Sequence, residues 1–420
     1  MRRGPTPGAL APGLASASAL RATARPRRSA SREGGTLALG SGSWLRSSPA
    51  GLPPPPFGLR RGPAEALRAK ADAPLAQAAD AFEAACWRAR QSQLSGMSAA
   101  LFAALVLILM AEFVNGWTDA PNAIATVIST RVLKPQHALL MAAALNAAGA
   151  FAGTAVAFTI GTGIVKPEII SLTTVAAAMV GIVVWSTIAW YYGLPTSESH
   201  ALVAGLSGAG LATAGPSVLL WEGWAKVLLG ILFSTGLGFG SGMLLMVAIY
   251  WGFARSPPEL VRTLFGRLQI LSAAIMAFSH GSNDGQKFIG VFTLALVLGG
   301  VLPEFHVPFW VILLCAATMG VGTAFGGWRI IRTMGLRLTK LEPVHGFAAE
   351  TGAGLTILLA SYYGIPLSTT HTINTAIIGV GSTRRLSAVR WGVVGSIVTA
   401  WILTFPICGA IAYAVALALS

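Results

Sequence analysis

From Met97 to the C-terminus the chain consists of long apolar runs separated by short polar breaks. Because each helical residue adds 1.5 Å, about 20 residues cross the hydrocarbon core of a bilayer. The sequence therefore predicts an all-α polytopic membrane protein. The expected membrane segments are 98–130, 136–160, 171–192, 196–212, 225–251, 269–300, 307–327, 344–363, 366–380 and 391–418.

The composition supports membrane residence and argues against a nucleic-acid partner. The chain is 54% hydrophobic and 10% charged, whereas an average soluble domain is about 25% charged. The formal net charge is +14, but residues 1–96 hold 14 Lys/Arg against 5 Asp/Glu and leave 15 against 10 for the remainder. Three cysteines, Cys86, Cys315 and Cys408, are too few and too scattered for a disulfide framework or a metal site. We expect no cofactor.

The N-terminal extension differs in character from the rest. Residues 1–63 are rich in Arg, Ser, Ala, Gly and Pro, contain Glu33 as their only acid and lack the apolar run of a secretory signal. This pattern is typical of an organellar transit peptide. Residues 64–96 form either an amphipathic helix on the membrane surface or a linker. We therefore expect a multi-pass protein of an organellar envelope, with the plastid inner membrane favoured over the mitochondrion and the plasma membrane.

Two polar motifs interrupt apolar segments. Residues 115–123 read N-G-W-T-D-A-P-N-A, and residues 280–287 read H-G-S-N-D-G-Q-K. An ionisable residue at membrane depth is expensive enough to be treated as functional by default. Asp119 and Asp284 are therefore the first candidates, against the alternative that each only caps a helix near the headgroups. We expect both helices to be broken at these motifs.

The chain also contains an internal repeat of two five-pass halves. Residues 193–200 read G-L-P-T-S-E-S-H and residues 364–371 read G-I-P-L-S-T-T-H, an offset of 171 positions. Asp119 and Asp284 are 165 positions apart. Five passes is an odd number, so the second copy should be inverted in the membrane. The expected parts are repeat 1 at 97–251, a basic loop at 252–268 and repeat 2 at 269–420.

Charge supports the inversion independently, since Lys and Arg collect in short loops on one side of a membrane. With five passes per half, all the basic loops fall on one side, and both ends of the membrane domain fall on the other. Their counterparts, residues 298–306 and 213–224, contain no Lys or Arg. The basic loops contain Arg131, Lys134, Arg255, Arg262, Arg267, Arg329, Arg332, Arg337, Lys340, Arg384, Arg385 and Arg390.

In inverted-repeat transporters, substrate and ions bind near the midplane, where discontinuous helices meet. The short Ser/Thr-rich hairpins beginning at Pro195 and Pro366 suit this position. Helix N-termini offer free N–H groups to anions, and the hydroxyls can donate to an oxyanion. The alternative is ordinary helix capping. Paired hairpins beside paired aspartates indicate a tetrahedral oxyanion such as phosphate, with cations held nearby.

These residues resemble the inorganic phosphate transporter family, over essentially all of residues 97–420. The most specific part is F-S-H-G-S-N-D-G-Q-K at 278–287, supported by residues 115–127 and by the two hairpins. The resemblance implies phosphate uptake coupled to Na⁺ or H⁺, an inverted repeat and a homodimer. By position it implies a cation site of Asp119, Asn122, Asn283 and Asp284, and phosphate contacts from Ser197, Ser199, Ser368, Thr369 and Thr370.

Several positions depart from the family pattern or remain ambiguous. Thr118 stands where the family usually has Asn or His. Asn146 stands where many sodium-coupled members have Glu, which favours the bacterial, proton-coupled branch. Glu198 either faces outward or takes part in coupling, and Glu350 is similarly ambiguous. His200 and His371 can shuttle protons or serve as structural, hydrogen-bonded residues. Lys287 is a counter-charge for phosphate or Asp284, unless it snorkels to the surface.

Two other functions are compatible with parts of the pattern. An intramembrane aspartyl protease also uses two aspartates, but it needs both carboxylates to share one proton, and here each aspartate comes with its own Asn and Gly. We therefore do not expect an enzyme. A carrier or channel for another oxyanion, such as sulfate, is the more serious alternative.

Overall fold

A computed structural model describes residues 99–420. The expected transit peptide at 1–63 and the Ala-rich stretch at 64–96 lie outside the described residues. Within 99–420 the structure is helical, and the only β contact in that part of the chain is an isolated bridge between Val165 and Leu219. The prediction of an all-α chain is confirmed for this part of the protein.

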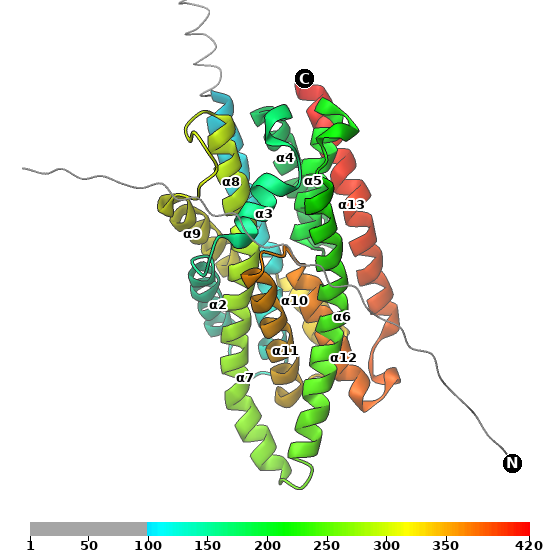
Figure 1. The fold of residues 1–420 in the computed structure, drawn as a ribbon. Coiled ribbons are helices and arrows are strands. Elements are labelled where there is room, and N and C mark those ends of the chain that lie inside the picture. The colour runs from blue at the N-terminus through cyan, green and yellow to red at the C-terminus, as the bar shows by residue number, and fades with distance from the viewer. Residues whose placement is uncertain (1–98) are drawn as a thin grey trace, which may run out of the picture. The chain divides into compact units, whose positions relative to one another are not determined.

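The helices follow one another with short connections (Figure 1). Two π-helical turns, Gly281–Gly285 and Arg332–Arg337, follow α7 and α10, and three short 3₁₀ turns occur at Pro167–Ile169, Pro216–Val218 and Leu386–Ala388. The helices are Ala99–Ser129, α2 (Pro135–Gly149), α3 (Ala155–Gly163), α4 (Leu172–Tyr192), α5 (Glu198–Ala214), α6 (Trp221–Gly252), α7 (Pro258–His280), α8 (Gln286–Leu298), α9 (Phe309–Phe325), α10 (Trp328–Ile331), α11 (Pro343–Tyr362), α12 (Thr369–Arg384) and α13 (Trp391–Leu419).

Fewer helices than expected meet the length and hydropathy of a full membrane crossing. In the described part of the chain five helices do so, or six if the bent pair Phe309–Phe325 and Trp328–Arg337 forms one span. The short segments α5 and α12 have only 17 and 16 residues. At 1.5 Å per residue neither length covers a bilayer core of about 30 Å.

The expected breaks at the two aspartate motifs are wrong. Ala99–Ser129 continues through Asp119 and Pro121 as one helix of 31 residues. The second motif lies in the π turn Gly281–Gly285, which joins α7 to α8 without interrupting the helix. A π turn inserts one extra residue into a helix. The helix therefore departs from regular α winding at Asp284 and stays regular at Asp119.

The real breaks lie one segment later in each half. The segment expected at 136–160 consists of α2 and α3, separated by residues 150–154. In the second half, α9 is followed after a bend of 60° by Trp328–Arg337. Gly326 adopts a φ of 65° at this bend, a conformation open to glycine at no steric cost. Hydropathy alone did not indicate the break at 150–154, because both sides of it are apolar, whereas the bend at Gly326 lies at the expected end of the segment 307–327.

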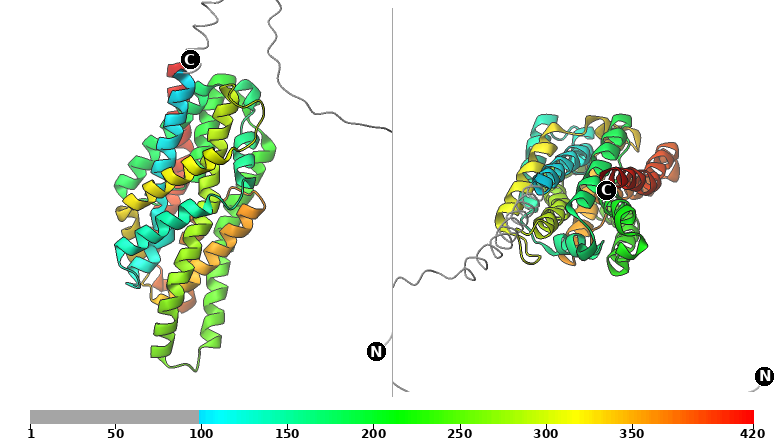
Figure 2. Two further views of the ribbon diagram at one scale, coloured as in Figure 1. Left: turned by 90° about the vertical axis from the view of Figure 1, so that its left-hand side faces the viewer. Right: turned by 90° about the horizontal axis from the view of Figure 1, so that it is seen from above.

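The two halves interlock through their last helices. Helix α5 of the first half packs on α13, and α12 of the second half packs on α6. Small residues permit this close approach, as they do in other membrane helix pairs: a Cβ at Gly208 would lie 2.2 Å from the carbonyl of Gly409, and one at Gly238 would lie 2.6 Å from that of Thr372. Seen from above, α13 (red) stands at the edge of the bundle (Figure 2).

Hydrogen bonds also join separate connections within each half. The backbone N–H of Arg390 donates to the carbonyl of Leu338 at 3.0 Å, which joins two basic loops. In the first half, the backbone N–H of Leu220 donates to the carbonyl of Ile164 at 3.1 Å. In Figure 1 the α6–α7 and α12–α13 connections lie at the lower end, whereas the C-terminus lies at the upper end.

Candidate functional site

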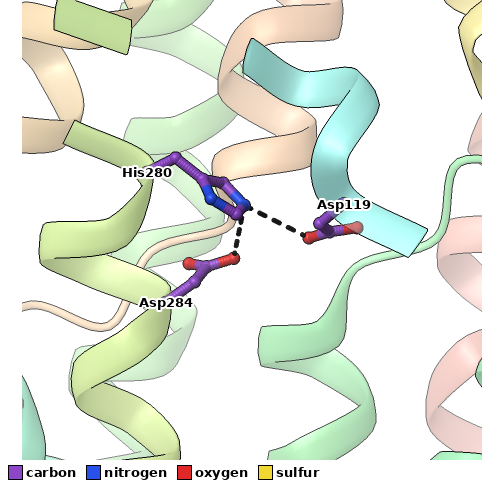
Figure 3. Close-up of side chains that lie close together, drawn as sticks. All are labelled: Asp119, His280 and Asp284. Atoms are coloured by element: carbon purple, nitrogen blue, oxygen red, sulfur yellow. Dashed lines mark ion pairs between the residues drawn. The ribbon is translucent and has the colours of Figure 1, made fainter. Parts of the chain in front are cut away.

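The centre of the site is a buried cluster of Asp119, His280 and Asp284. Each residue offers one ligand atom, and these atoms lie within 4.8 Å of one another. His280 Nε2 is 3.3 Å from Asp284 Oδ2 and 3.8 Å from Asp119 Oδ2. Figure 3 shows the imidazole pointing between the two carboxylates. Buried charges persist in proteins when they are paired or bind a metal ion, so this cluster brings both predicted aspartates to one point.

Helix α2 orients the imidazole of His280. A Cβ on Gly281 would lie 2.0 Å from the carbonyl oxygen of Asn146, so the glycine lets α2 cross directly against the π turn. Asn146 Nδ2 donates to Thr323 Oγ1 at 3.0 Å, and Asn146 Oδ1 lies 3.1 Å from His280 Nδ1. Because the amide oxygen can only accept, His280 Nδ1 carries the proton of that bond. The other ring nitrogen, Nε2, therefore faces the carboxylates.

The first residues of α12 bridge the two motifs. Thr369 Oγ1 donates to Asp284 Oδ2 at 2.9 Å, and Thr370 Oγ1 donates to Asp119 Oδ2 at 3.3 Å. Asn122 Nδ2 donates to Thr370 Oγ1 at 2.9 Å. The hydroxyls of the two consecutive threonines thus donate to different aspartates. Oxygen atoms from carboxylates, hydroxyls and amides are the ligands that hard cations prefer.

Lys287 lies one helical turn after Asp284 and is 1% exposed. Its ammonium pairs with Asp284 Oδ1, contacts Ser199 Oγ and donates to the carbonyl of Leu367 at 2.9 Å. The snorkelling alternative is therefore wrong, because the side chain points into the protein. An ammonium has three protons to donate, and each has an oxygen partner here.

The hairpin serines divide between two positions. Ser197 and Ser368 are the N-caps of α5 and α12, and their hydroxyls accept from the N–H groups of His200 and His371 at 3.3 and 3.1 Å. Their local arrangement is the capping alternative of the sequence analysis. Ser199 Oγ instead faces the second hairpin, where it lies 2.9 Å from the carbonyl of Leu367. The starts of α5 and α12 therefore touch.

His200 and His371 meet where these two helix starts approach, with ring centroids 4.5 Å apart. His371 Nδ1 lies 2.6 Å from Ser368 Oγ, and its ring stacks on Trp401 at 3.6 Å. Neither ring nitrogen of His200 has a hydrogen-bond partner among the described residues. His371 thus has the contacts of a structural histidine, whereas His200 is buried without polar partners.

Asn283 points toward α11 and the second hairpin. Its Nδ2 donates to Ser361 Oγ at 3.0 Å and to the carbonyl of Ile365 at 3.3 Å. Its Oδ1 is buried and has no hydrogen-bond partner in residues 99–420. A buried amide oxygen without a donor is uncommon in proteins, so this atom is free to accept from a bound group.

Two further carboxyl groups are buried beside the site. Glu198 accepts from Thr118 Oγ1 at 3.1 Å and from Ser186 Oγ at 2.9 Å and is 1% exposed, so the outward-facing alternative is wrong. Glu350 is fully buried and accepts from Thr126, Ser272 and Gln269. Among the described residues neither group forms an ion pair with a basic side chain.

Sequence reasoning missed His280 and Glu112 as candidate residues. The signal for His280 was its spacing, since residues four apart share one helix face and it precedes Asp284 by four. The signal for Glu112 was a carboxylate inside an apolar run. It is fully buried and accepts from Asn115 Nδ2 at 2.9 Å, while Glu112 Oε1 and Asn115 Oδ1 lack partners within residues 99–420.

Comparison with known proteins identifies relatives of the whole helical region. Residues 115–412 match the model of the phosphate transporter family. The chain is 47% identical over 304 residues to a probable low-affinity inorganic phosphate transporter of Rhizobium meliloti, covering 72% of this chain and 91% of the relative. It is 37% identical over 315 residues to one from Bacillus subtilis, covering 74% and 95%. A solved sodium-dependent phosphate transporter has a TM-score of 0.71 at 26% identity, covering 76% of this chain and 99% of the solved one.

Proposed function

Since this chain belongs to the phosphate transporter family, we propose that it is a secondary active transporter that moves inorganic phosphate together with a cation, Na⁺ or H⁺. The observation that carries the coupling is the joining of Asp119 and Asp284 by consecutive hydroxyls of α12. A cation bound there neutralises buried carboxylates and compensates the charge of phosphate. The printed name of the solved relative makes sodium one candidate.

The cation site in this proposal contains Asp119, Asn122, Asn283 and Asp284. The first two residues after the caps of α5 and α12 supply hydroxyls and free N–H groups, which suit an oxyanion. The contact between Ser199 Oγ and the Leu367 carbonyl at 2.9 Å supports a shared pocket for phosphate between the two helix starts. The proposed phosphate contacts are Ser197, Ser199, Ser368, Thr369 and Thr370. Glu198, His200 and His371 remain candidates for proton relay.

We also propose that the two halves, 97–251 and 269–420, are inverted in the membrane and joined by the basic loop at 252–268. The hydrogen bond from the Arg390 N–H to the Leu338 carbonyl supports a common side for two of the basic loops, both in the second half. Cysteines introduced at the exposed positions Lys340 and Ser387 should label from one side of the membrane, and one at exposed Ser217 from the other. Labelling of all three from one face contradicts the inversion.

The assembly and location in the proposal rest on the family resemblance and on the extension. We propose a homodimer in an organellar envelope, with the plastid inner membrane favoured. A fluorescent fusion of residues 1–96 should reach the organelle, and cross-linking in membranes should trap a dimer. A cytosolic fusion together with a plasma-membrane location of the whole protein contradicts the organellar assignment.

Uptake by purified protein in proteoliposomes tests the function directly. Radiolabelled phosphate should accumulate when a sodium or proton gradient is imposed, and counterflow from phosphate-loaded vesicles should distinguish a carrier from a channel. Absence of accumulation under either gradient contradicts coupled phosphate transport.

Competition by other anions tests the substrate. Arsenate should compete at concentrations similar to phosphate, since it has nearly the same size and carries the same protons. Sulfate lacks a proton to donate to a buried carboxylate, and an unpaired buried acceptor costs about 1–3 kcal/mol. We therefore expect sulfate to compete about tenfold less well or worse. Equal inhibition by sulfate and phosphate favours a general oxyanion carrier instead.

A further inference from the structure

Among the differences between the duplicated aspartate motifs is the side chain three residues after each aspartate. Three residues after Asp119 comes Asn122, and three residues after Asp284 comes Lys287. Both side chains project from the turn that follows their aspartate. The repeat has therefore placed a neutral amide in one half and an ammonium in the equivalent position of the other half.

The contacts of these two side chains share one feature. Asn122 Nδ2 donates to Thr370 Oγ1 at 2.9 Å, and that hydroxyl donates to Asp119 at 3.3 Å. Lys287 Nζ contacts Ser199 Oγ and pairs with Asp284. Each amide or ammonium thus contacts a hydroxyl from the hairpin of the opposite half.

Those two hydroxyl residues also correspond by sequence. Ser199 precedes His200 by one position, and Thr370 precedes His371 by one position, so each occupies the same place in its hairpin. Each half consequently brings together a carboxylate, a hydroxyl from the other half, and the side chain three residues after the carboxylate. In the first half the Thr370 hydroxyl donates to Asp119, whereas in the second half the Lys287 ammonium pairs with Asp284 directly and Ser199 Oγ donates to the Leu367 carbonyl.

We propose that the Lys287 ammonium is a tethered cation that occupies the second of two duplicated cation positions, so that a free monovalent cation is taken only at the Asp119 position. This inference rests on the proposed function, because it concerns how many cations accompany phosphate. It makes Lys287 the residue that sets cation stoichiometry in this chain.

The surroundings of Lys287 fit an ammonium in place of a free ion. Its three partners are a carboxylate, a hydroxyl and the Leu367 carbonyl at 2.9 Å, the kinds of oxygen that also coordinate alkali and alkaline-earth cations. The side chain is 1% exposed, and Asp284 is 1% exposed. A second cation placed on the same oxygens would face a like charge at close range with little water to screen it.

The Asp119 position has no such internal cation. Among the described residues the only basic group paired with Asp119 is His280, at 3.8 Å. Asn122 adds an amide but no charge. Asp119, Asn122 and Thr370 would therefore hold the free cation, while the equivalent set around Asp284 already contains one.

Substitution of Lys287 in the full-length protein tests the proposal. Lys287→Asn gives the second motif the residue that the first motif has at the equivalent position, Asn122, and should create a second free cation position. We expect equilibrium binding of radioactive ²²Na⁺ to the detergent-solubilised variant to exceed that of wild type by one ion per protomer. In proteoliposomes, phosphate uptake by this variant should fall at low sodium, recover at high sodium and depend on sodium more steeply than in wild type.

Two control variants separate the charge from the fold. Lys287→Arg keeps a cation and should add no sodium binding, whereas Lys287→Met removes both the charge and the polar group and should lose uptake that sodium does not restore. Unchanged sodium binding by a monodisperse Lys287→Asn protein would falsify the proposal, as would extra sodium binding by Lys287→Arg. Failure of wild type to take up phosphate contradicts the proposed function instead, while the binding comparison still decides the role of Lys287.

Discussion

Asp119 and Asp284 occupy equivalent positions in the two halves, but the helices that hold them differ. Asp119 lies in an uninterrupted helix of 31 residues and accepts from Thr370 at 3.3 Å. Asp284 lies in a π turn, accepts from Thr369 at 2.9 Å and pairs with Lys287. The two carboxylates of the recurring motif therefore have different electrostatic partners. Equivalent positions need not have equivalent functions.

Local spacing accounts for part of this asymmetry. His280 and Lys287 lie four residues before and three residues after Asp284 and both face it, whereas Asn122, three residues after Asp119, carries no charge. The first half instead provides Asn146, which orients His280 from α2. The negative charge of Asp284 is thus compensated by closer basic groups than that of Asp119. In the proposed mechanism, it is therefore Asp119 that binds the free cation.

The largest expected effect is the loss of Asp284. Asp284→Asn leaves Lys287 as an unpaired buried ammonium, and breaking a buried ion pair from one side costs about 3–5 kcal/mol. We expect phosphate uptake to be lost and the melting temperature of the solubilised protein to fall clearly. Asp119→Asn should also lose coupled uptake but with a smaller fall in melting temperature, since its nearest basic group among the described residues is His280 at 3.8 Å.

Uptake and fluorescence-monitored melting of the two variants measure this difference side by side. Equal falls in melting temperature would remove the distinction between the two halves. If both variants take up phosphate at the wild-type rate, neither aspartate belongs to the proposed cation site.

A smaller effect is expected at Asn146. Asn146→Leu removes the acceptor of His280 Nδ1 and the donor to Thr323, and a buried polar group left without its partner costs about 1–3 kcal/mol. Because the imidazole would lose its orientation toward both carboxylates, we expect uptake to fall about 10- to 100-fold, in the range seen when residues that support metal ligands are changed. Initial rates of uptake at saturating phosphate measure this fall in transport.

Asn146→Asp is the matched control for this prediction, since it keeps the acceptor oxygen and the size of the side chain. Its uptake should exceed that of the leucine variant. If the leucine variant transports as well as wild type, the orientation of His280 has no part in transport.

The smallest expected effect compares the two helix caps. Ser197→Ala and Ser368→Ala each remove an N-cap, which costs about 1 kcal/mol. Ser368 also lies 2.6 Å from His371 Nδ1, so its loss should be the larger of the two. We expect apparent phosphate affinity to weaken about fivefold for Ser368→Ala and less for Ser197→Ala. Concentration curves of uptake measure both, and the reverse order would contradict a closer role for the second hairpin.

Much of the fold was predictable because the signals are local. The apolar runs indicated helices, and the positions of Pro195 and Pro366 indicated where the short helices α5 and α12 begin. The aspartate motifs were found because carboxylates in apolar runs are rare. For the same reason we expected the helix breaks at the aspartate motifs, where polar residues interrupt the apolar runs. The chain instead turns at residues 150–154 and at Gly326, where the adjacent residues are apolar.

The sequence singled out several residues that the structure brings together, but it did not give their pairing. Sequence indicated Asp119, Asp284, Thr369 and Thr370 as candidates, yet nothing in it assigned each threonine to one aspartate. His280 was overlooked although it belongs to the same motif as Asp284. A histidine beside an aspartate on one helix face becomes informative only when a second carboxylate, from a distant segment, completes the cluster.

The sequence by itself determined that this chain is a helical membrane protein in which two polar motifs recur, because hydropathy and motifs are read over a few residues at a time. It also placed Lys287 within one turn of Asp284, which makes their pairing a local event. Only the tertiary structure decided that Ser199, 88 positions away, and the carbonyl of Leu367, 80 positions away, complete the ammonium's partners. Those contacts depend on how the two halves interlock, which no local pattern specifies.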